Sequence, residues 1–380
     1  MTLAWIASLT MAVAAVPVAS PGYDSTRLRQ DVAAIHKAGV TGVEAQVWTP
    51  SRRMSARAGV ADIRGNRSMP VDGYFRIAST TKSFVATVVL QLAAERKVSL
   101  DAGIEKYLPG LVRGRGNDGR TITVRQLLQH TSGLHDYAND LFADLVDRKS
   151  WRKHRLDRHS AEELVKMALR HKPQFKPGTR WAYSNTNYLL AGMIIKKVTG
   201  KSWDREVRER IAKPLGLRHT FNPTTPYLPK PHARAYVKFR PAESWTDTTV
   251  SRDNFADGGL VSTITDLNRF FRALIGGQVL PAAQLAEMKK TVPADVPDIP
   301  GQRYGLGLFW TPLTCGGGYW GHGGDGAGHK SREGILDDGR HSVVVFTQSM
   351  ILDNTATQRH ERADQRLIDH ALCAAKAPRR

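Results

Sequence analysis

Segments with strand character lie at both ends of this chain, and a long, mostly helical region separates them. Residues 43–49 and 54–62 are β-rich runs joined by a polar turn, and four further runs separated by tight turns follow residue 302. No regular alternation of strands and helices links the two ends. We therefore expect an α+β fold in which one antiparallel sheet, built from N- and C-terminal strands, is flanked by helices.

The same pattern predicts two lobes. Its 380 residues suit one large domain or two ordinary ones. Residues 25–100 and 300–373 are expected to form an α/β lobe, and residues 100–300 a mostly helical lobe. A cleft between the lobes is the natural place for a site. Residues 374–380 are expected to be a disordered tail.

One expected helix, over residues 80–96, is apolar on nearly every face. Val85, Val88 and Leu92 follow the helical spacing of one face, while Phe84 and Leu90 occupy others. A helix that is apolar all round is buried. We therefore expect it at the centre of the molecule.

The first twenty residues carry no charged side chain and end in the small residues Val18-Ala19-Ser20. This pattern favours a secretory signal peptide over residues 1–20, although the usual basic n-region is missing. A membrane anchor or a buried helix is the alternative interpretation. The expected location is therefore secreted or extracytoplasmic.

The chain has two cysteines, Cys315 and Cys373. In an exported protein such a pair is expected to be bridged, which would tie the last helix to the C-terminal sheet. Neither cysteine has a histidine ligand pattern beside it, and His154, His159 and His171 are interpreted as separate surface histidines. We expect no metal site and no cofactor.

The charge is strongly basic, with 55 lysines and arginines against 35 acidic residues and a net charge of +20. Such a surface favours polyanions, including an anionic cell wall, although a merely solvated arginine-rich surface is the simpler interpretation. No helix-turn-helix, zinc-finger or RNA-binding signature occurs. We therefore expect no nucleic-acid partner.

A serine one helical turn before a lysine marks the start of the apolar helix, at Ser79 and Lys82. Residues i and i+3 share a helix face, so the lysine amine can take the serine proton, the more so if burial lowers its pKa. The alternative is an N-cap serine beside a surface lysine. A second match, Ser150 and Lys153, lies in a basic polar stretch and is interpreted as surface.

Tyr183 and Asn185 lie in an expected loop that follows Pro177-Gly178 and precedes another apolar helix. A tyrosine there can relay a proton between the serine and a leaving group, and Asn185 can hold Lys82 and a substrate amide. Tyr137-Ala138-Asn139 is a competing match, and a lone tyrosine usually serves packing.

His322 ends an expected strand and is followed by Gly323, Gly324 and Asp325. We expect Gly324 to let substrate backbone approach the strand edge, and the N–H groups of Asp325 and Ser79 to bind an oxyanion. His322 near Lys82 and Tyr183 would tune their charges. The simpler interpretation is a turn histidine.

Together these motifs resemble those of the penicillin-recognising serine hydrolases, in the branch of soluble DD-carboxypeptidases, class C β-lactamases, esterases and D-aminopeptidases. The resemblance covers about residues 25–373. It is closest to the secreted D-alanyl-D-alanine carboxypeptidases, which carry histidine in the third motif and a cysteine pair at these two places. Three other stretches fit this branch: Leu127–Leu134, Gly258–Thr263 and Tyr304–Leu308.

The resemblance implies an acyl-enzyme on Ser79. The expected substrate is a peptidoglycan stem peptide or another small acyl compound, β-lactams are expected to acylate the serine, and the protein is expected to be a monomer. A β-lactamase, esterase or D-aminopeptidase with the same chemistry is an alternative. A non-catalytic wall-binding or penicillin-sensing module is the other.

Three positions depart from the closest members. Phe309 stands where they carry an arginine that holds the substrate carboxylate, and Gly323 and Asp325 stand where they carry threonines. A carboxylate would lose charge-assisted hydrogen bonds and meet an anion. The nearby cations that would have to compensate are Arg303, Lys330 and Arg332.

Overall fold

The computed structural model describes residues 22–252, 254–294, 296 and 299–376. The expected signal peptide, residues 1–20, lies outside the described residues. The last helix continues to Lys376, three residues into the segment expected to be a tail, and residues 377–380 also lie outside. No helix in the described part of the chain is both long and apolar enough to span a membrane.

A ten-stranded antiparallel sheet forms the frame, and it joins both ends of the chain as expected. The N-terminal hairpin pairs with the C-terminal strands where β1 meets β16. Along the sheet the strands are β10 (Val292–Pro293), β11 (Arg303–Tyr304), β12 (Phe309–Pro312), β13 (Gly318–Gly321), β15 (His329–Ile335), β16 (Ser342–Thr347), β1 (Gly42–Trp48), β2 (Arg53–Asp62) and β3 (Arg67–Ser68), with β14 (Gly323–Gly326) beside β15.

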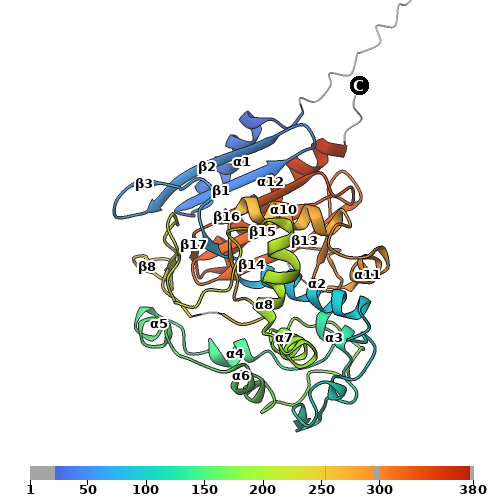
Figure 1. Ribbon diagram of the computed structural model, residues 1–380. Coiled ribbons are helices and arrows are strands. Elements are labelled where there is room, and N and C mark those ends of the chain that lie inside the picture. The colour runs from blue at the N-terminus through green and yellow to red at the C-terminus, as the bar shows by residue number, and fades with distance from the viewer. Residues whose placement is uncertain (1–21, 253, 295, 297–298, 377–380) are drawn as a thin grey trace, which may run out of the picture.

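Helices cover both faces of this sheet (Figure 1). The terminal helices α1 (Ser25–Lys37) and α12 (Asn354–Lys376) lie together on one face. On the other face α10 (Ile264–Ile275) contacts β1, β15 and β16. Alternate residues of β1 explain the two sides, because Val43 faces the terminal helices while Gln46 hydrogen-bonds to Thr265 and Asn268.

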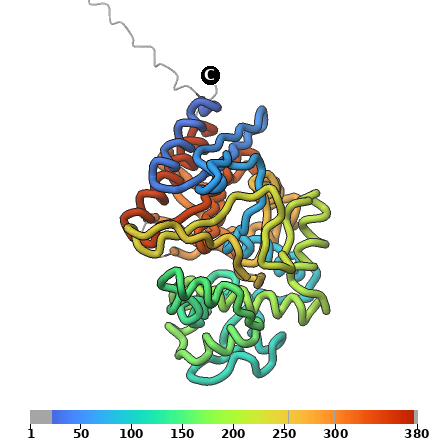
Figure 2. Tube along the Cα trace, turned by 90° about the vertical axis from the view of Figure 1, so that its left-hand side faces the viewer, coloured from blue at the N-terminus to red at the C-terminus, as the bar shows by residue number. Residues whose placement is uncertain are grey.

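A second lobe consists mainly of helices, and Figure 2 shows it in green below the blue and red terminal segments. Its helices are α3 (Val124–Leu128), α4 (Tyr137–Leu141), α5 (Arg148–His154), α6 (Ala161–Ala168), α7 (Thr186–Thr199) and α8 (Trp203–Val207). The π-helix Arg208–Ala212 and the short α9 (Lys213–Leu215) follow, and α11 (Ala282–Met288) lies later in the chain.

Short elements complete the fold. The 3₁₀ turns are Ala78–Thr80 and Ile104–Lys106. The small strand pairs and the three-stranded sheet are β4 (Phe75–Arg76) with β9 (Val261–Ser262), β5 (Arg113–Gly114) with β6 (Asn117–Asp118), and β17 (Ser349–Ile351) with β7 (Tyr236–Lys238) and β8 (Thr246–Asp247).

The apolar helix α2 (Thr81–Ala94) lies at the centre, as its sequence predicts. Eleven of its residues are buried, and it contacts α7, α8 and α11. Phe84 stacks on Phe270 of α10 with ring centroids 3.6 Å apart. This helix therefore links the sheet to the helical lobe and fixes the position of the residues at its N-terminus.

The two cysteines form a disulfide, Cys315–Cys373, with Cα atoms 5.8 Å apart. Cys315 follows β12, and Cys373 lies near the end of α12. The bridge therefore ties the last helix to the C-terminal strands, as the sequence predicts.

Candidate active site

Ser79 lies in the 3₁₀ turn that leads into α2. The preceding Ala78 has φ of +42°, a conformation that non-glycine residues seldom adopt. The fully buried Lys82 places its Nζ 3.1 Å from Ser79 Oγ. The serine and the lysine that the sequence predicts as partners are thus in hydrogen-bond contact.

Lys82 Nζ has two further acceptors. It donates to Asn185 Oδ1 at 2.7 Å and to the backbone oxygen of Asp257 at 2.6 Å. These contacts come from two distant loops, so the amine has a fixed position beside the serine oxygen. A base held this way meets the geometric requirement for activating a hydroxyl nucleophile.

The Tyr183 hydroxyl hydrogen-bonds to Ser79, and its ring lies 4.9 Å from Lys82 Nζ. Burial raises the pKa of Tyr183 well above its ordinary value, more than the Ser79 hydrogen bond lowers it. The phenol is therefore neutral at physiological pH, and it can pass a proton but does not carry a stored negative charge.

Asn185 is oriented by an aspartate that sequence reasoning missed. Asp136 accepts from the Asn185 backbone N–H at 3.1 Å and from its Nδ2 at 3.0 Å, so Asn185 Oδ1 is turned toward Lys82. Asp257 was missed as well, although it directly precedes the Gly258–Thr263 stretch. Both residues adjoin motif stretches, which is the only signal that could have found them.

His322 lies beside the same groups. Its ring centroid is 6.5 Å from that of Tyr183, and its Nε2 is 3.0 Å from the Tyr304 hydroxyl. Burial, assisted by the positive charge of Lys82, lowers the pKa of His322 to about 3. The imidazole is therefore neutral and acts on its neighbours through hydrogen bonding, without a charge of its own.

Gly324 permits a close approach between β14 and the turn that carries Ser79. A Cβ atom at this position would lie 1.9 Å from the backbone oxygen of Ile77. The sequence predicted that the glycine makes room for substrate backbone, whereas the structure shows the protein's own backbone there. The consequence is that Asp325 and Ser79 line the same cavities.

The side chain of Asp325 belongs to a cluster of four charges. Asp325 Oδ1 lies 3.0 Å from Arg332 and 3.4 Å from Lys330, and Glu361 lies 2.7 Å from Arg332 and 2.9 Å from Lys330. The positive charges of Arg332 and Lys330 hold the pKa of Asp325 below its usual range. The two cations expected to compensate for the missing arginine are therefore paired.

Phe309 belongs to an aromatic wall. Its ring contacts Tyr304 and His322, with centroids 4.5 Å and 5.2 Å away, and Trp181 at 6.4 Å. The third compensating candidate, Arg303, is hydrogen-bonded to Thr291 through Nε at 2.8 Å. The place of the carboxylate-binding arginine is therefore apolar.

Two cavities meet at Ser79. One, of about 460 Å³, is lined by Tyr183, Phe309 and His322. The other, of about 710 Å³, lies beside Asn185 and extends over apolar side chains. Asp325 lines both cavities. An extended substrate can therefore place its scissile bond at the serine and its two halves in different cavities.

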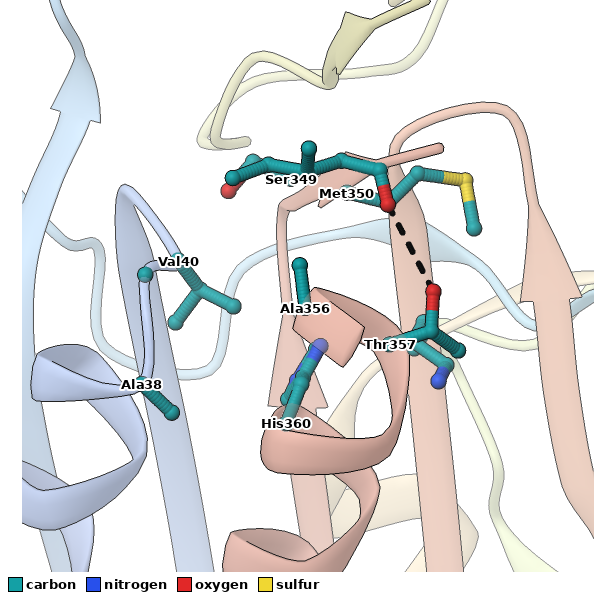
Figure 3. Close-up of a pocket in the computed structure, with 10 residues that line it drawn as sticks. Ala38, Val40, Ser349, Met350, Ala356, Thr357 and His360 are labelled. Carbon is teal, nitrogen blue, oxygen red and sulfur yellow. Dashed lines mark hydrogen bonds between the residues drawn. The ribbon is translucent and has the colours of Figure 1, made fainter. Parts of the chain in front are cut away.

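Another hollow lies between the loop after α1 and the start of α12 (Figure 3). Thr357 Oγ1 donates to the Ile351 backbone oxygen there at 3.5 Å. The volume of this hollow, about 10 Å³, suits one water molecule, so the hollow is not a substrate site.

The competing matches to the serine–lysine and tyrosine motifs, at Ser150 and Tyr137, have structural partners of their own. Ser150 forms a capping box with Asp147 at the start of α5, so it serves helix capping. The Tyr137 hydroxyl donates to Asp257 Oδ2 at 2.8 Å. Of the three histidines expected on the surface, His154 pairs with Asp157, His159 lines the larger cavity, and His171 lies against Asp140.

Comparison with known proteins identifies the family. The family model described as "Beta-lactamase" matches residues 27–367. The chain belongs to the β-lactamase family. The antiparallel sheet, its covering helices and the motif positions agree with this assignment, and the protein is a serine hydrolase of the β-lactamase and penicillin-binding protein family.

The names of the relatives within this family point to different substrates. Penicillin-binding protein 4* of Bacillus subtilis is 29% identical over 231 residues, which are 57% of this chain and 48% of the relative, so the chain spans about half of its length. The D-stereospecific amidohydrolase from a Streptomyces species is 40% identical, with a TM-score of 0.81 over 90% of this chain and 98% of that one.

A further solved structure also resembles this chain in fold and sequence. It is the D-amino acid amidase from Ochrobactrum anthropi SV3, in complex with L-phenylalanine amide. It is 30% identical, with a TM-score of 0.80 over 92% of this chain and 97% of that one. Both solved structures are matched over nearly their whole length.

Proposed function

We propose that this enzyme is a D-stereospecific amidohydrolase that cleaves small D-amino-acid amides through an acyl-enzyme on Ser79. The observation that carries the proposal is the apolar side of the site at Phe309. A peptide with a terminal carboxylate needs a cation there, because burying an unpaired charge is costly. Arg332 and Lys330 are engaged with Asp325 and Glu361, whereas the leaving side of an amide has no carboxylate that a cation must neutralise.

The names of the two solved relatives support the same substrate class. Both act on D-configured substrates according to their names, and both are matched over more than nine tenths of their length. The D-stereospecificity in the proposal derives from this likeness.

The position of Tyr183 assigns the two halves of the substrate. The leaving amine needs a proton, and the Tyr183 phenol that can deliver it lines the smaller cavity. The acyl group then occupies the larger cavity beside Asn185. Its apolar lining suits a bulky aliphatic or aromatic substituent, and it includes Leu141, Phe142, Leu145, Trp151, Phe239 and Phe255.

The chemistry follows from these placements. In its neutral form, the Lys82 amine takes the proton of the Ser79 hydroxyl as Oγ attacks the amide carbon, and backbone N–H groups hold the oxyanion. The C–N bond breaks as the amine takes a proton through Tyr183. Water then gives up a proton to Lys82 and Tyr183 as its oxygen attacks the ester carbon. The bond to Ser79 Oγ breaks, Oγ takes that proton, and the acid is released.

A substrate panel tests the proposal. D-phenylalanine amide, L-phenylalanine amide, D-alanine amide and diacetyl-Lys-D-Ala-D-Ala are compared by kcat/KM on purified enzyme. We expect the D-phenylalanine amide to exceed its L-enantiomer and the peptide by about tenfold or more, because the larger cavity holds the apolar side chain and Arg332 and Lys330 are already paired with Asp325 and Glu361. A clear preference for the D-Ala-D-Ala peptide would reject the proposal.

A second candidate is a D-alanyl-D-alanine carboxypeptidase-like activity on cell-wall peptides, with β-lactams as acylating ligands. The likeness to penicillin-binding protein 4* favours it, as does the contact of Ser79 with Lys82. Labelling with a fluorescent penicillin, followed by peptide mapping, shows whether Ser79 is the acylated residue. Stable labelling together with cleavage of the D-Ala-D-Ala peptide would favour this candidate over the amidase.

Extracytoplasmic location is also a proposal. It is supported by the disulfide between Cys315 and Cys373, since such bridges persist mainly in oxidising compartments. Fractionation of the native host tests it, and a reduced protein confined to the cytosol would contradict it. That the protein is a monomer stays a prediction, which light scattering checks.

A further inference from the structure

Three side chains with metal-ligand chemistry converge at the edge of the helical lobe. His135 lies just before α4, Asp140 lies within α4, and His171 lies just after α6. His171 Nε2 is 2.9 Å from Asp140 Oδ2, and His135 Nε2 is 3.4 Å from Asp140 Oδ1. The ligand atoms of all three residues lie within 4.8 Å of one another.

The spacing of the ligand atoms suits a shared ion, and the rings of His135 and His171, which stack with centroids 3.8 Å apart, would have to turn toward it. Zinc binds imidazole nitrogen and carboxylate oxygen at about 2.0–2.2 Å, so tetrahedral ligand atoms lie about 3.3 Å apart. The two imidazole–carboxylate distances fall near that value. His135 Nε2 is buried and makes no hydrogen bond within the described part of the chain, although it faces Asp140. Such an atom is the kind that a metal would satisfy.

We propose that His135, Asp140 and His171 bind a divalent transition-metal ion, with zinc as the best match to two imidazoles and one carboxylate. Water fills the fourth position, since His171 and Asp140 are partly exposed, with side-chain exposures of 44% and 31%. The site lies outside the Ser79 chemistry, and no catalytic step requires the ion.

The contacts of the His135 backbone show what the ion would do. Its carbonyl oxygen accepts from Ser184 Oγ at 3.2 Å and from Thr186 Oγ1 at 2.7 Å. The next residue, Asp136, orients Asn185. An ion held by His135 therefore braces the segment that positions Asn185 against Lys82, and it joins that segment to α6 through His171.

The chain offers a matched control. His154 and Asp157 also form a close imidazole–carboxylate pair, at 2.7 Å, on the same lobe. No third ligand atom joins them among the described residues. Two ligands hold a transition metal weakly, so the His154→Gln variant should bind zinc as the wild type does.

The experiment uses full-length protein without a histidine tag, freed of metal by a chelator. Zinc chloride is titrated against a chromophoric competitor at pH 7.5 for wild type, His171→Gln, Asp140→Asn and His154→Gln. We expect one ion per chain in wild type and His154→Gln, and an affinity at least about tenfold lower in the other two variants. Equal binding by all four proteins, or none by wild type, would overturn the proposal.

Two readouts separate a built site from weak surface binding. Cobalt(II) should give wild type the visible absorption of a tetrahedral ion, and His171→Gln should lack it. Zinc should raise the melting temperature of wild type and His154→Gln but not that of His171→Gln, because a ligand stabilises only a fold that binds it. An equal shift in all three proteins would show that binding lies elsewhere. Since His171 is partly exposed, its replacement leaves the core intact.

Discussion

At the scale of single residues, the chemistry rests on the 3.1 Å contact between Ser79 Oγ and Lys82 Nζ. The same four-residue spacing occurs at Ser150 and Lys153, where the serine only caps a helix. What separates the two is burial, since Lys82 is fully buried and has acceptors on two distant loops. The motif becomes a nucleophile and base only in that setting.

The Ser79→Ala variant should lose nearly all turnover. Removing the nucleophile of a serine hydrolase lowers kcat by about 10³-fold or more, because only binding and oxyanion contacts remain. Steady-state kinetics on the preferred amide measures the loss. The matched control is Ser150→Ala, whose rate should stay within about twofold of wild type. Comparable loss in both variants would contradict the assignment.

Phe309→Arg should shift substrate preference toward peptides that end in a carboxylate. A guanidinium at this place supplies the charge-assisted hydrogen bonds that the aromatic wall lacks. We expect kcat/KM for diacetyl-Lys-D-Ala-D-Ala, relative to D-phenylalanine amide, to rise about tenfold. Phe309→Leu, which removes the ring without adding charge, should not raise this ratio. A rise of equal size with leucine would show that charge is not the cause.

Glu333→Gln should change how stability depends on pH. Burial raises the pKa of Glu333 from 4.5 to about 8, so the folded protein binds this proton more tightly than the unfolded chain does. The proton therefore stabilises the fold fully below pH 4.5, and this stabilisation is lost as the pH rises to about 8. Relative to the variant, wild type should lose up to about 1.4 kcal/mol per pH unit in that window. Urea denaturation at pH 5, 7 and 9 measures this. A constant difference between the proteins would refute it.

At the scale of elements, the site depends on how closely β14 approaches the turn before α2. Gly324→Ala should cost at least about 2 kcal/mol of folding free energy and most activity, because the new Cβ meets the backbone oxygen of Ile77 at 1.9 Å. Gly323→Ala should cost less, since the nearest atom is a side-chain nitrogen of Arg332 at 2.9 Å and not a backbone atom. Urea midpoints and kcat report both effects, and equal losses would argue against this account.

Elements with a strong local pattern could be predicted from the sequence. The apolar faces of α2 and the alternation in the N-terminal hairpin appear in short windows, so both were expected where the structure has them. Asp136 and Asp257 could not be assigned in this way. Their roles depend on contacts with Asn185 and Lys82 across 49 and 175 residues, and no local pattern encodes such contacts.

At the scale of the whole molecule, the sequence predicted a sheet made from both termini because strand patterns occur only near the two ends. It could not show that α10, in the middle of the chain, packs against that sheet. The packing depends on which apolar surface is free once the sheet has formed. In the same way, the motif at Phe309 showed a missing arginine, but only the folded chain shows that Arg332 and Lys330 are paired.

The disulfide should stabilise the molecule without affecting the reaction. It closes a segment of 58 residues and lies at the end of α12, away from Ser79. The double variant Cys315→Ser and Cys373→Ser should lose about 2–4 kcal/mol of folding free energy, with KM unchanged. Urea denaturation of oxidised and variant protein measures this. An unchanged midpoint would show that the bridge contributes little.

The meeting of two cavities at Ser79 has a consequence for the order of events. When the amine leaves through the smaller cavity, the acyl half stays bound in the larger one. The ester therefore keeps one position until a second molecule enters the smaller cavity. A second amine that enters by the vacated side reaches the ester along the same path as water. With such an amine in excess, the enzyme would therefore join two building blocks as well as separate them.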